Sequence, residues 1–143
     1  MPSTVHQSLV TWAIRKMQVD GYVPFAYDGE LSQFDCLRRL LNSPTLFGLR
    51  PDAIGYSYRD NAFAFAEAKT AADLISMHTK FQLRRYRALL AATSGTRLYF
   101  AIPRSAALTL DHVLRDAGLD TVGSVMRLHI PDCFVSEGEL VYA

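Results

Sequence analysis

Cysteine is scarce in this sequence: Cys36 and Cys133 are the only two among 143 residues. They lie far apart and match no metal-ligand spacing, which argues against a disulfide framework or a zinc site. Long apolar runs are also missing. The run SLVTWAI near the start is far too short to span a bilayer, and Arg15 and Lys16 follow it, whereas a secretory signal carries its charge first. These absences predict a reduced, cytoplasmic protein without a membrane segment.

Neither sign of charge is in excess, because the net charge is +1. This balance gives no global basic signal of the kind that marks many nucleic-acid binders. The charge is nevertheless segregated: from His78 to Asp116, seven Lys and Arg residues stand against two Asp residues, which gives 7 − 2 = +5 for that segment. Such a face fits contact with phosphates and equally fits a solvated helix surface. The sequence has no glycine-rich loop for nucleotide phosphates.

Length and composition predict one globular domain over residues 1–143, because 50% of the residues are hydrophobic and the chain is too short for two comfortable cores. Residues 4–18 carry apolar positions at an i, i+4, i+7, i+8 spacing, which predicts an amphipathic helix ended by Gly21. A glycine- and proline-punctuated segment, GYVPFAYDGE, then leads to a second predicted helix, which Ser32 caps.

The second part of the chain alternates strands and helices. Two strand-like runs, DAIGYSY and AFAFAEAK, flank Arg59-Asp60-Asn61, whose Asp and Asn tolerate the positive φ angles of tight turns, and this predicts a β-hairpin. The further predicted elements follow in order: a helix over 78–93, a buried strand over 97–103, a helix from Ser105 to roughly Ala117 and a strand over 122–130. The predicted fold class is α/β, a mixed β-sheet built from the hairpin and a right-handed βαβ crossover and flanked by helices.

Charged residues occupy an unusual place in the second strand of the hairpin. In FAFAEAKT, residues 63–70, Glu67 and Lys69 lie on the face that Phe63 and Phe65 begin as apolar. The opposite face carries only alanines, which are small enough for a helix to pack closely over them. A strand that is covered on both sides and charged at one end predicts that this end forms the lip of a cleft.

The register of the hairpin brings a third charged residue to this end. A turn on Asp60 and Asn61 places Asp52 opposite Lys69 and puts both on one face with Glu67. Two carboxylates and an ammonium at the mouth of a buried sheet are costly unless something pairs them. Mg²⁺ would do so, because it is held by one or two carboxylates and completes its shell with water, carbonyl and phosphate oxygens. Such an ion activates water for attack on a phosphodiester, while Lys69 orients that water.

The same residues carry a resemblance to a known family. Arg50-Pro51-Asp52, fourteen intervening residues and Glu67-Ala68-Lys69, followed by a crossover helix and another strand, resemble the PD-(D/E)XK nuclease superfamily, which includes many restriction endonucleases and archaeal-type Holliday junction resolvases. Gln82 and Tyr86 in QLRRY resemble the QxxxY motif of the RecB-type branch, and at i and i+4 they share one helix face. The resemblance covers roughly residues 4–103 and implies a restriction-endonuclease-like core.

The resemblance implies a role for each matching residue. Asp52 and Glu67 would be metal ligands, Ala68 would offer its backbone carbonyl, Lys69 would be the catalytic lysine, and Gln82 and Tyr86 would support the positioning of substrate and metal. The implied cofactor is Mg²⁺, with Mn²⁺ as the other candidate. Lys80, Arg84, Arg85 and Arg87 are the candidates for contact with DNA phosphates, although a solvent-facing role stays open for the arginines.

One feature departs from the family pattern. Members often place a glutamate on the first helix as a further metal ligand or water-positioning group, and residues 4–18 contain no acid. His6 or Gln7 could occupy that position, and Asp28 and Glu30 are the other candidates. A histidine ligand there would favour a softer metal such as Mn²⁺, or a site with a weaker ion.

The leading hypothesis is a metal-dependent DNA endonuclease without an added recognition domain. Its specificity would then come from DNA structure, partner proteins or a homodimer that pairs two cuts, as in junction resolution, repair, recombination or restriction. One alternative is a catalytically inactive nuclease-like subunit for DNA binding or assembly. Another is an α/β interaction protein with an ion-paired strand end, which predicts no nucleic-acid affinity. RNA as the substrate also stays open.

Overall fold

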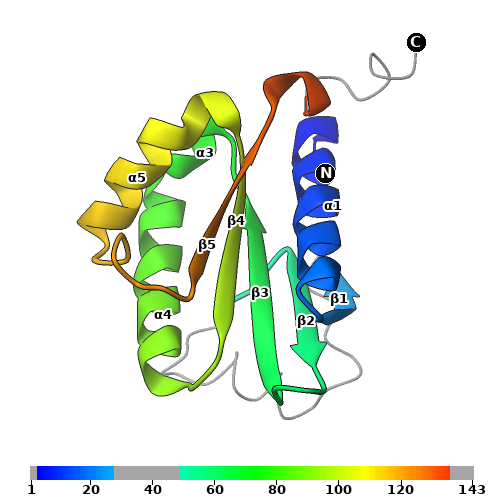
Figure 1. Cartoon of the computed structure of the whole chain (residues 1–143). Helices are drawn as coiled ribbons and strands as arrows, with labels where there is room; N and C mark the ends of the chain where they lie inside the picture. Colours follow the sequence, from blue (N-terminus) through cyan, green and yellow to red (C-terminus); the bar gives the residue numbers. More distant parts are fainter. Residues whose placement is uncertain (1–2, 28–48, 136–143) are drawn as a thin grey trace.

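The computed structural model describes residues 3–27 and 49–135, which form a five-stranded mixed sheet flanked by helices (Figure 1). The strands lie in sequence order across the sheet: β1 (Val23–Tyr27), β2 (Ala53–Ser57), β3 (Ala62–Ala68), β4 (Arg97–Pro103) and β5 (Val125–Ile130). The pairs β1–β2 and β2–β3 are antiparallel, and β3–β4 and β4–β5 are parallel. The predicted α/β class is confirmed.

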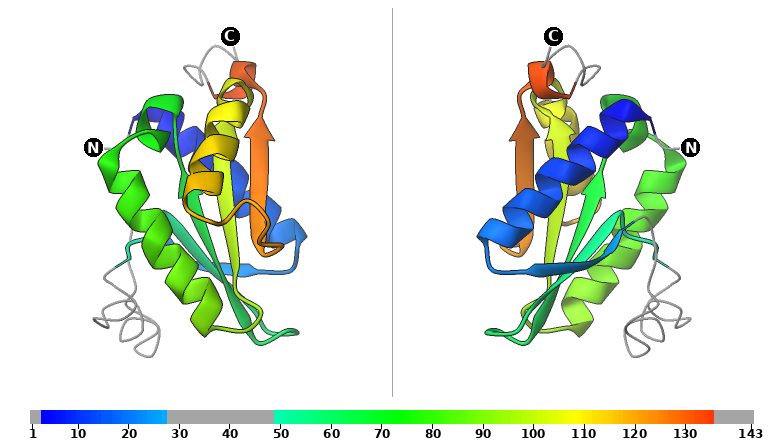
Figure 2. Two further views of the ribbon diagram at one scale, coloured as in Figure 1. Left: turned by 90° about the vertical axis from the view of Figure 1, so that its left-hand side faces the viewer. Right: turned by 90° about the vertical axis from the view of Figure 1, so that its right-hand side faces the viewer.

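Helix α1 (Thr4–Val19) covers one face of the sheet (Figure 2). Its first turn is capped by Ser3, whose side chain accepts a hydrogen bond from the His6 backbone N–H at 3.1 Å. Its buried stripe of Leu9, Val10, Ala13 and Met17 packs with the alanines of β3 in one core cluster. Small side chains on β3 allow this close approach, as the alternation of the strand predicts.

The opposite face of the sheet is covered by α4 (Met77–Ala92) and α5 (Ala107–Asp116), with the short α3 (Ala71–Leu74) before α4 (Figure 2). Ser76 caps α4 by accepting a hydrogen bond from the Thr79 N–H at 3.2 Å. Together, α3 and α4 join the parallel strands β3 and β4, so the predicted strand–helix–strand crossover is present. This face buries Phe65, Leu83 and Phe100 in the larger core cluster.

One strand was missed in the sequence, and the predicted start of one helix is wrong. The segment GYVPFAYDGE contains the strand β1, which lies at the sheet edge, where Pro24 is tolerated, and its register with β2 shifts between Pro24 and Ala26. Ser105 does not cap a helix, because it lies within a 3₁₀ turn, Arg104–Ala106, and its backbone N–H donates to Asp132 at 3.0 Å. The helix predicted after Ser32 lies outside the described residues.

The predicted register of the hairpin is also wrong, by two residues. Ser57 pairs with Ala62, so the connection is four residues long and includes Asn61 at a positive φ of 51°. A shift of two residues keeps every side chain on its face. The ladder ends at the pair Ala53 and Ala66, and the N–H of Asp52, the residue before β2, donates to the Ala66 carbonyl at 3.0 Å, which keeps Asp52 beside β3.

No helix within residues 3–27 and 49–135 is both long and apolar enough to cross a bilayer.

Candidate active site

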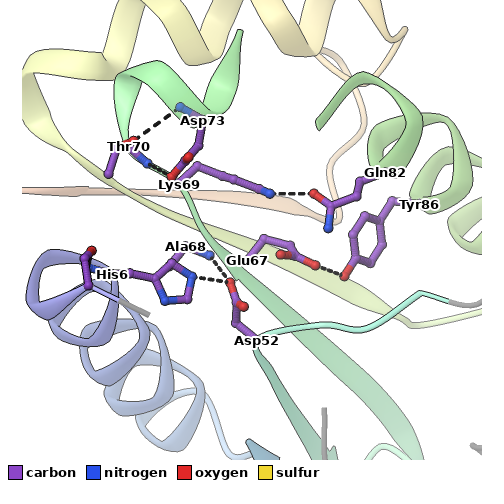
Figure 3. Close-up of polar contacts among 10 residues, drawn as sticks. His6, Asp52, Glu67, Ala68, Lys69, Thr70, Asp73, Gln82 and Tyr86 are labelled. Atoms are coloured by element: carbon purple, nitrogen blue, oxygen red, sulfur yellow. Dashed lines mark hydrogen bonds and ion pairs between the residues drawn. The ribbon is translucent and has the colours of Figure 1, made fainter. Parts of the chain in front are cut away.

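Asp52 stands just before β2 and is held from two sides (Figure 3). Its Oδ2 atom accepts a hydrogen bond from the Ala68 backbone N–H at 2.8 Å and lies 3.2 Å from Nε2 of His6 on α1. Burial alone would raise the pKa of Asp52, but these two hydrogen bonds more than offset it, so the pKa lies below its usual value. Asp52 is therefore a carboxylate held in a fixed position just before the first residue of β2.

Glu67 lies on β3 close to Asp52 and is only 2% exposed. Its Oε2 atom accepts a hydrogen bond at 2.5 Å from the hydroxyl of Tyr86, which is itself fully buried on α4. Burial, followed by the charge of Asp52, raises the pKa of Glu67 to about 8, although Lys69 and the Tyr86 hydrogen bond act in the other direction. Two facing carboxylates in a buried place cannot both stay ionised at low cost without a cation.

Lys69 follows β3 directly, and its side chain is also buried, at 7% exposure. Its Nζ atom donates to Oε1 of Gln82 on α4 at 2.5 Å. Its backbone N–H donates to the Ala101 carbonyl at 3.1 Å, which fixes the chain to the neighbouring β4. The two residues that resemble the QxxxY motif thus each hold one charged residue of the strand end: Gln82 contacts Lys69, and Tyr86 contacts Glu67.

His6 contacts Asp52 through Nε2. The hydrogen bond to Asp52 raises the pKa of His6, and burial only partly opposes it, so the contact favours the protonated ring. The Nδ1 atom of His6 is buried and has no hydrogen-bond partner among the described residues. His6 would have to give up its contact with Asp52 to bind a metal through Nε2. Gln7 is exposed on α1, and the candidates Asp28 and Glu30 lie outside the described residues.

The donor set suits Mg²⁺. Within the part of the chain that the structure describes, no three His, Cys, Asp or Glu side chains are grouped as a ready-made metal cage. Mg²⁺ does not need one, because it is usually held by one or two carboxylates and keeps several waters. The carboxyl groups of Asp52 and Glu67 lie close together, and a cation between them would relieve the cost of burying Glu67 beside a second carboxylate. The residues present therefore fit the implied ion.

One device at this site was missed in the sequence. Thr70 and Asp73 form a capping box at the start of α3: the Asp73 N–H donates to the Thr70 hydroxyl at 3.2 Å, and the Thr70 N–H donates to the Asp73 carboxylate at 3.1 Å. The box turns the chain immediately after Lys69 and so fixes the exit from the strand (Figure 3). The spacing Thr-x-x-Asp is the readable signal for such a cap.

The candidate DNA-contacting residues are all exposed on α4, but they do not form one group. Lys80, Arg84 and Arg87 line a cavity between α4 and α5, and Arg85 does not. The four residues were predicted as one group, although the helical period of 3.6 residues places Arg85 on a different side of α4 from the other three.

Comparisons with protein-family models, with curated proteins and with solved structures give no match to this chain. Support for a function therefore comes from the contacts drawn in Figure 3.

Tyr86→Phe is expected to lower the free energy of unfolding by about 1–3 kcal/mol, because it leaves the buried Glu67 carboxylate without its hydroxyl donor. Chemical denaturation of both proteins at pH 8 would measure the loss. Tyr99→Phe is the matched control, since it also removes a hydroxyl that donates to a carboxylate, that of Asp20, at 2.6 Å. Only Tyr86→Phe should also impair any metal-dependent activity, and equal effects of both variants on activity would contradict a role for Tyr86 in positioning Glu67.

Proposed function

We propose that this protein is a metal-dependent DNA endonuclease with a restriction-endonuclease-like core of the PD-(D/E)XK type. The observation that carries the proposal is the convergence of five side chains at one end of β3. Asp52, just before β2, lies close to Glu67 on β3, Lys69 follows β3 directly, and α4 supplies a partner to Glu67 and to Lys69. The residues that carry the resemblance in sequence are thus the residues that meet in space.

Each residue has a task that its contacts support. Asp52 and Glu67, with the Ala68 carbonyl, would hold Mg²⁺, which when bound lowers the pKa of its water and neutralises charge on the phosphodiester. Lys69 orients the attacking water and stabilises the negative charge that builds on phosphorus, because Gln82 fixes its ammonium group beside the two carboxylates. Tyr86 fixes the orientation of Glu67 in the same way.

His6 serves Asp52 in this scheme. The contact between Nε2 and Oδ2 holds the carboxylate from α1, while the Ala68 N–H holds it from β3. The first helix thereby contributes to the site through a partner of a metal ligand, where the family pattern often has an acid.

Cleavage of a labelled substrate panel tests the proposal. The panel contains supercoiled plasmid, linear duplex, single strand, flap, four-way junction and RNA, each with Mg²⁺, Mn²⁺ or EDTA. Cutting that requires the metal and that Lys69→Ala abolishes would support a nuclease and identify its substrate. Cutting in EDTA, or cutting that Lys69→Ala leaves unchanged, would overturn it.

A second candidate is a nuclease-like DNA-binding or assembly subunit without activity. The pairing of His6 with Asp52 favours it, because the contact of His6 Nε2 with Oδ2 of Asp52 at 3.2 Å competes with a metal ion for that carboxylate oxygen. Salt-sensitive DNA binding without cutting by either metal would support this candidate. A homodimer in the cytoplasm belongs to the proposal in both forms, and sedimentation at several concentrations would test the dimer.

A further inference from the structure

The groove between α4 and α5 is a second place where charge gathers. It holds a cavity of about 290 Å³. Three cations line it, Lys80, Arg84 and Arg87, around the apolar side chains Leu83, Val113 and Ala117, and Asp116 is the one acidic residue among the described residues of the lining. The cations are spaced i, i+4 and i+7, so they form one stripe along α4.

Among the described residues, the three cations of this stripe have no acidic partner. Within residues 3–27 and 49–135, no carboxylate lies within ion-pair distance of any of them, and α4 itself contains no Asp or Glu. By contrast, several cations elsewhere do have a partner: Lys16, Arg59, Arg97 and Arg127 each lie within 4.0 Å of an aspartate. The stripe is therefore positive charge that the described fold does not neutralise.

Two of the three cationic groups are held in place by packing. The Arg87 guanidinium lies against Gly118, which ends α5 with a positive φ of 74°, and a Cβ atom there would lie 3.2 Å from Cζ of Arg87. The Arg84 guanidinium lies over the ring of Phe81, with Cζ 5.8 Å from the ring centroid. Groups that are already fixed lose less conformational entropy when they bind a ligand.

The stripe is separate from the candidate active site. At 3.6 residues per turn, Lys80 and Arg84 each lie about 160° around α4 from Gln82. Gln82 faces Lys69 and the strand ends (Figure 3), while the stripe lines the groove between α4 and α5. A ligand in the groove therefore cannot be the phosphate at the strand ends.

We propose that the α4–α5 groove binds the sugar-phosphate backbone of DNA at a stretch away from the bond that is cut, an inference that rests on the proposed function. The stripe from Lys80 to Arg87 is about 10 Å long, and a DNA strand carries one charge per about 3.4 Å of helix axis, so the stripe matches several successive phosphates. The apolar floor of the groove suits the sugars between them. DNA that reaches both the groove and the strand ends has to pass around α4.

The double variant Lys80→Ala/Arg84→Ala tests the groove, because both side chains are exposed and their loss leaves the core intact. Binding of a long labelled duplex is measured in EDTA across a salt series. The slope of log K against log salt is expected to fall in magnitude by about 2, one unit for each lost phosphate contact. The control Arg15→Ala/Arg59→Ala removes the same charge from exposed positions elsewhere and should leave the slope close to that of the wild type.

A variant that should bind DNA more tightly shows whether weaker binding by the double variant could come from misfolding. Asp116→Asn removes the one acidic residue of the lining and should strengthen DNA binding, which a misfolded protein could not do. An unchanged slope in the double variant, a slope change no larger than that of the control, or an effect seen with RNA and not with DNA would overturn the groove. The salt slope does not depend on cleavage. If the wild type cuts no substrate and the double variant still lowers the slope, the proposed nuclease function is wrong and DNA binding by the groove is supported.

Discussion

Lys69→Met is expected to reduce metal-dependent cleavage of DNA by at least about 100-fold, the usual cost of removing one group that stabilises transition-state charge. Methionine matches the apolar stem of lysine as far as Cε, so the variant should fold and fill most of the same buried space. It removes the ammonium group that Gln82 holds beside the two carboxylates. DNA binding should stay near the wild-type level, because the exposed cations of α4 remain.

Two measurements make this result interpretable. Single-turnover cleavage at saturating enzyme reports the chemical step, and anisotropy in EDTA reports binding separately. Lys16→Met is the matched control. It removes a lysine outside the candidate site, whose Nζ atom donates to Asp20 at 3.0 Å, and cleavage should stay at the wild-type rate. Cleavage by Lys69→Met at the wild-type rate would remove Lys69 from the mechanism and with it the main support for a nuclease.

The parts of this fold that the sequence predicted are those in which local pattern and tertiary role agree. The strand over 97–103 is a continuous apolar run that ends at a proline, and the structure has β4 with these bounds. The helix predicted over 4–18 is confirmed as α1, because its apolar stripe meets the alanine face of β3. Both elements were therefore predictable from their own local sequence.

The errors lie where distant segments decide the structure. Val23–Tyr27 is a strand because β2 offers it an edge to pair with, and its own sequence, with proline at the second position, gives only a weak signal. The register of the hairpin depends on how many residues its connection takes up, and a turn signal at Asp60 and Asn61 fits loops of two or four residues.

The candidate site was predictable in its members and not in their contacts. Spacing along a strand and a helix puts Glu67 with Lys69 and Gln82 with Tyr86, but only the packed crossover pairs Gln82 with Lys69 and Tyr86 with Glu67. The contact of His6 with Asp52 joins residues 46 positions apart on a helix and a strand end, so no local pattern encodes it. The error of two residues in the predicted register did not change which residues were predicted for the site, because a shift of two leaves each side chain on the same face of the sheet.

Glu67→Gln is expected to abolish metal-dependent cleavage and, in EDTA, to make the protein more stable than the wild type at pH 8. Glutamine has nearly the shape of glutamate, can still accept the Tyr86 hydrogen bond and carries no charge into the buried site opposite Asp52. Function and stability would then respond in opposite directions, as expected where a buried charge is kept for chemistry.

The pH dependence of stability provides the sharper test. The pKa of Glu67 is raised from 4.5 to about 8 in the folded state, so the native protein retains a proton that the unfolded chain has lost. The stability that this proton contributes is fully present below about pH 4.5 and is lost as the pH rises through about 8. The raised pKa of His6 acts in the same direction above 6.5. Denaturation of the wild type in EDTA should therefore show a fall of a few kcal/mol across this range.

In Glu67→Gln most of this fall should disappear, leaving the smaller part due to His6. Asp60→Asn, at the exposed hairpin turn, is the control and should keep the wild-type dependence. Adding Mg²⁺ at pH 8 should restore stability to the wild type, because an ion that binds the ionised carboxylates stabilises the native state by mass action, and it should have little effect on the variant. Two results would contradict this role of Glu67: a wild-type stability that does not change from pH 5 to 8, or equal stabilisation of both proteins by Mg²⁺. Either would show that Glu67 is not the buried, metal-binding carboxylate on which the proposed chemistry depends.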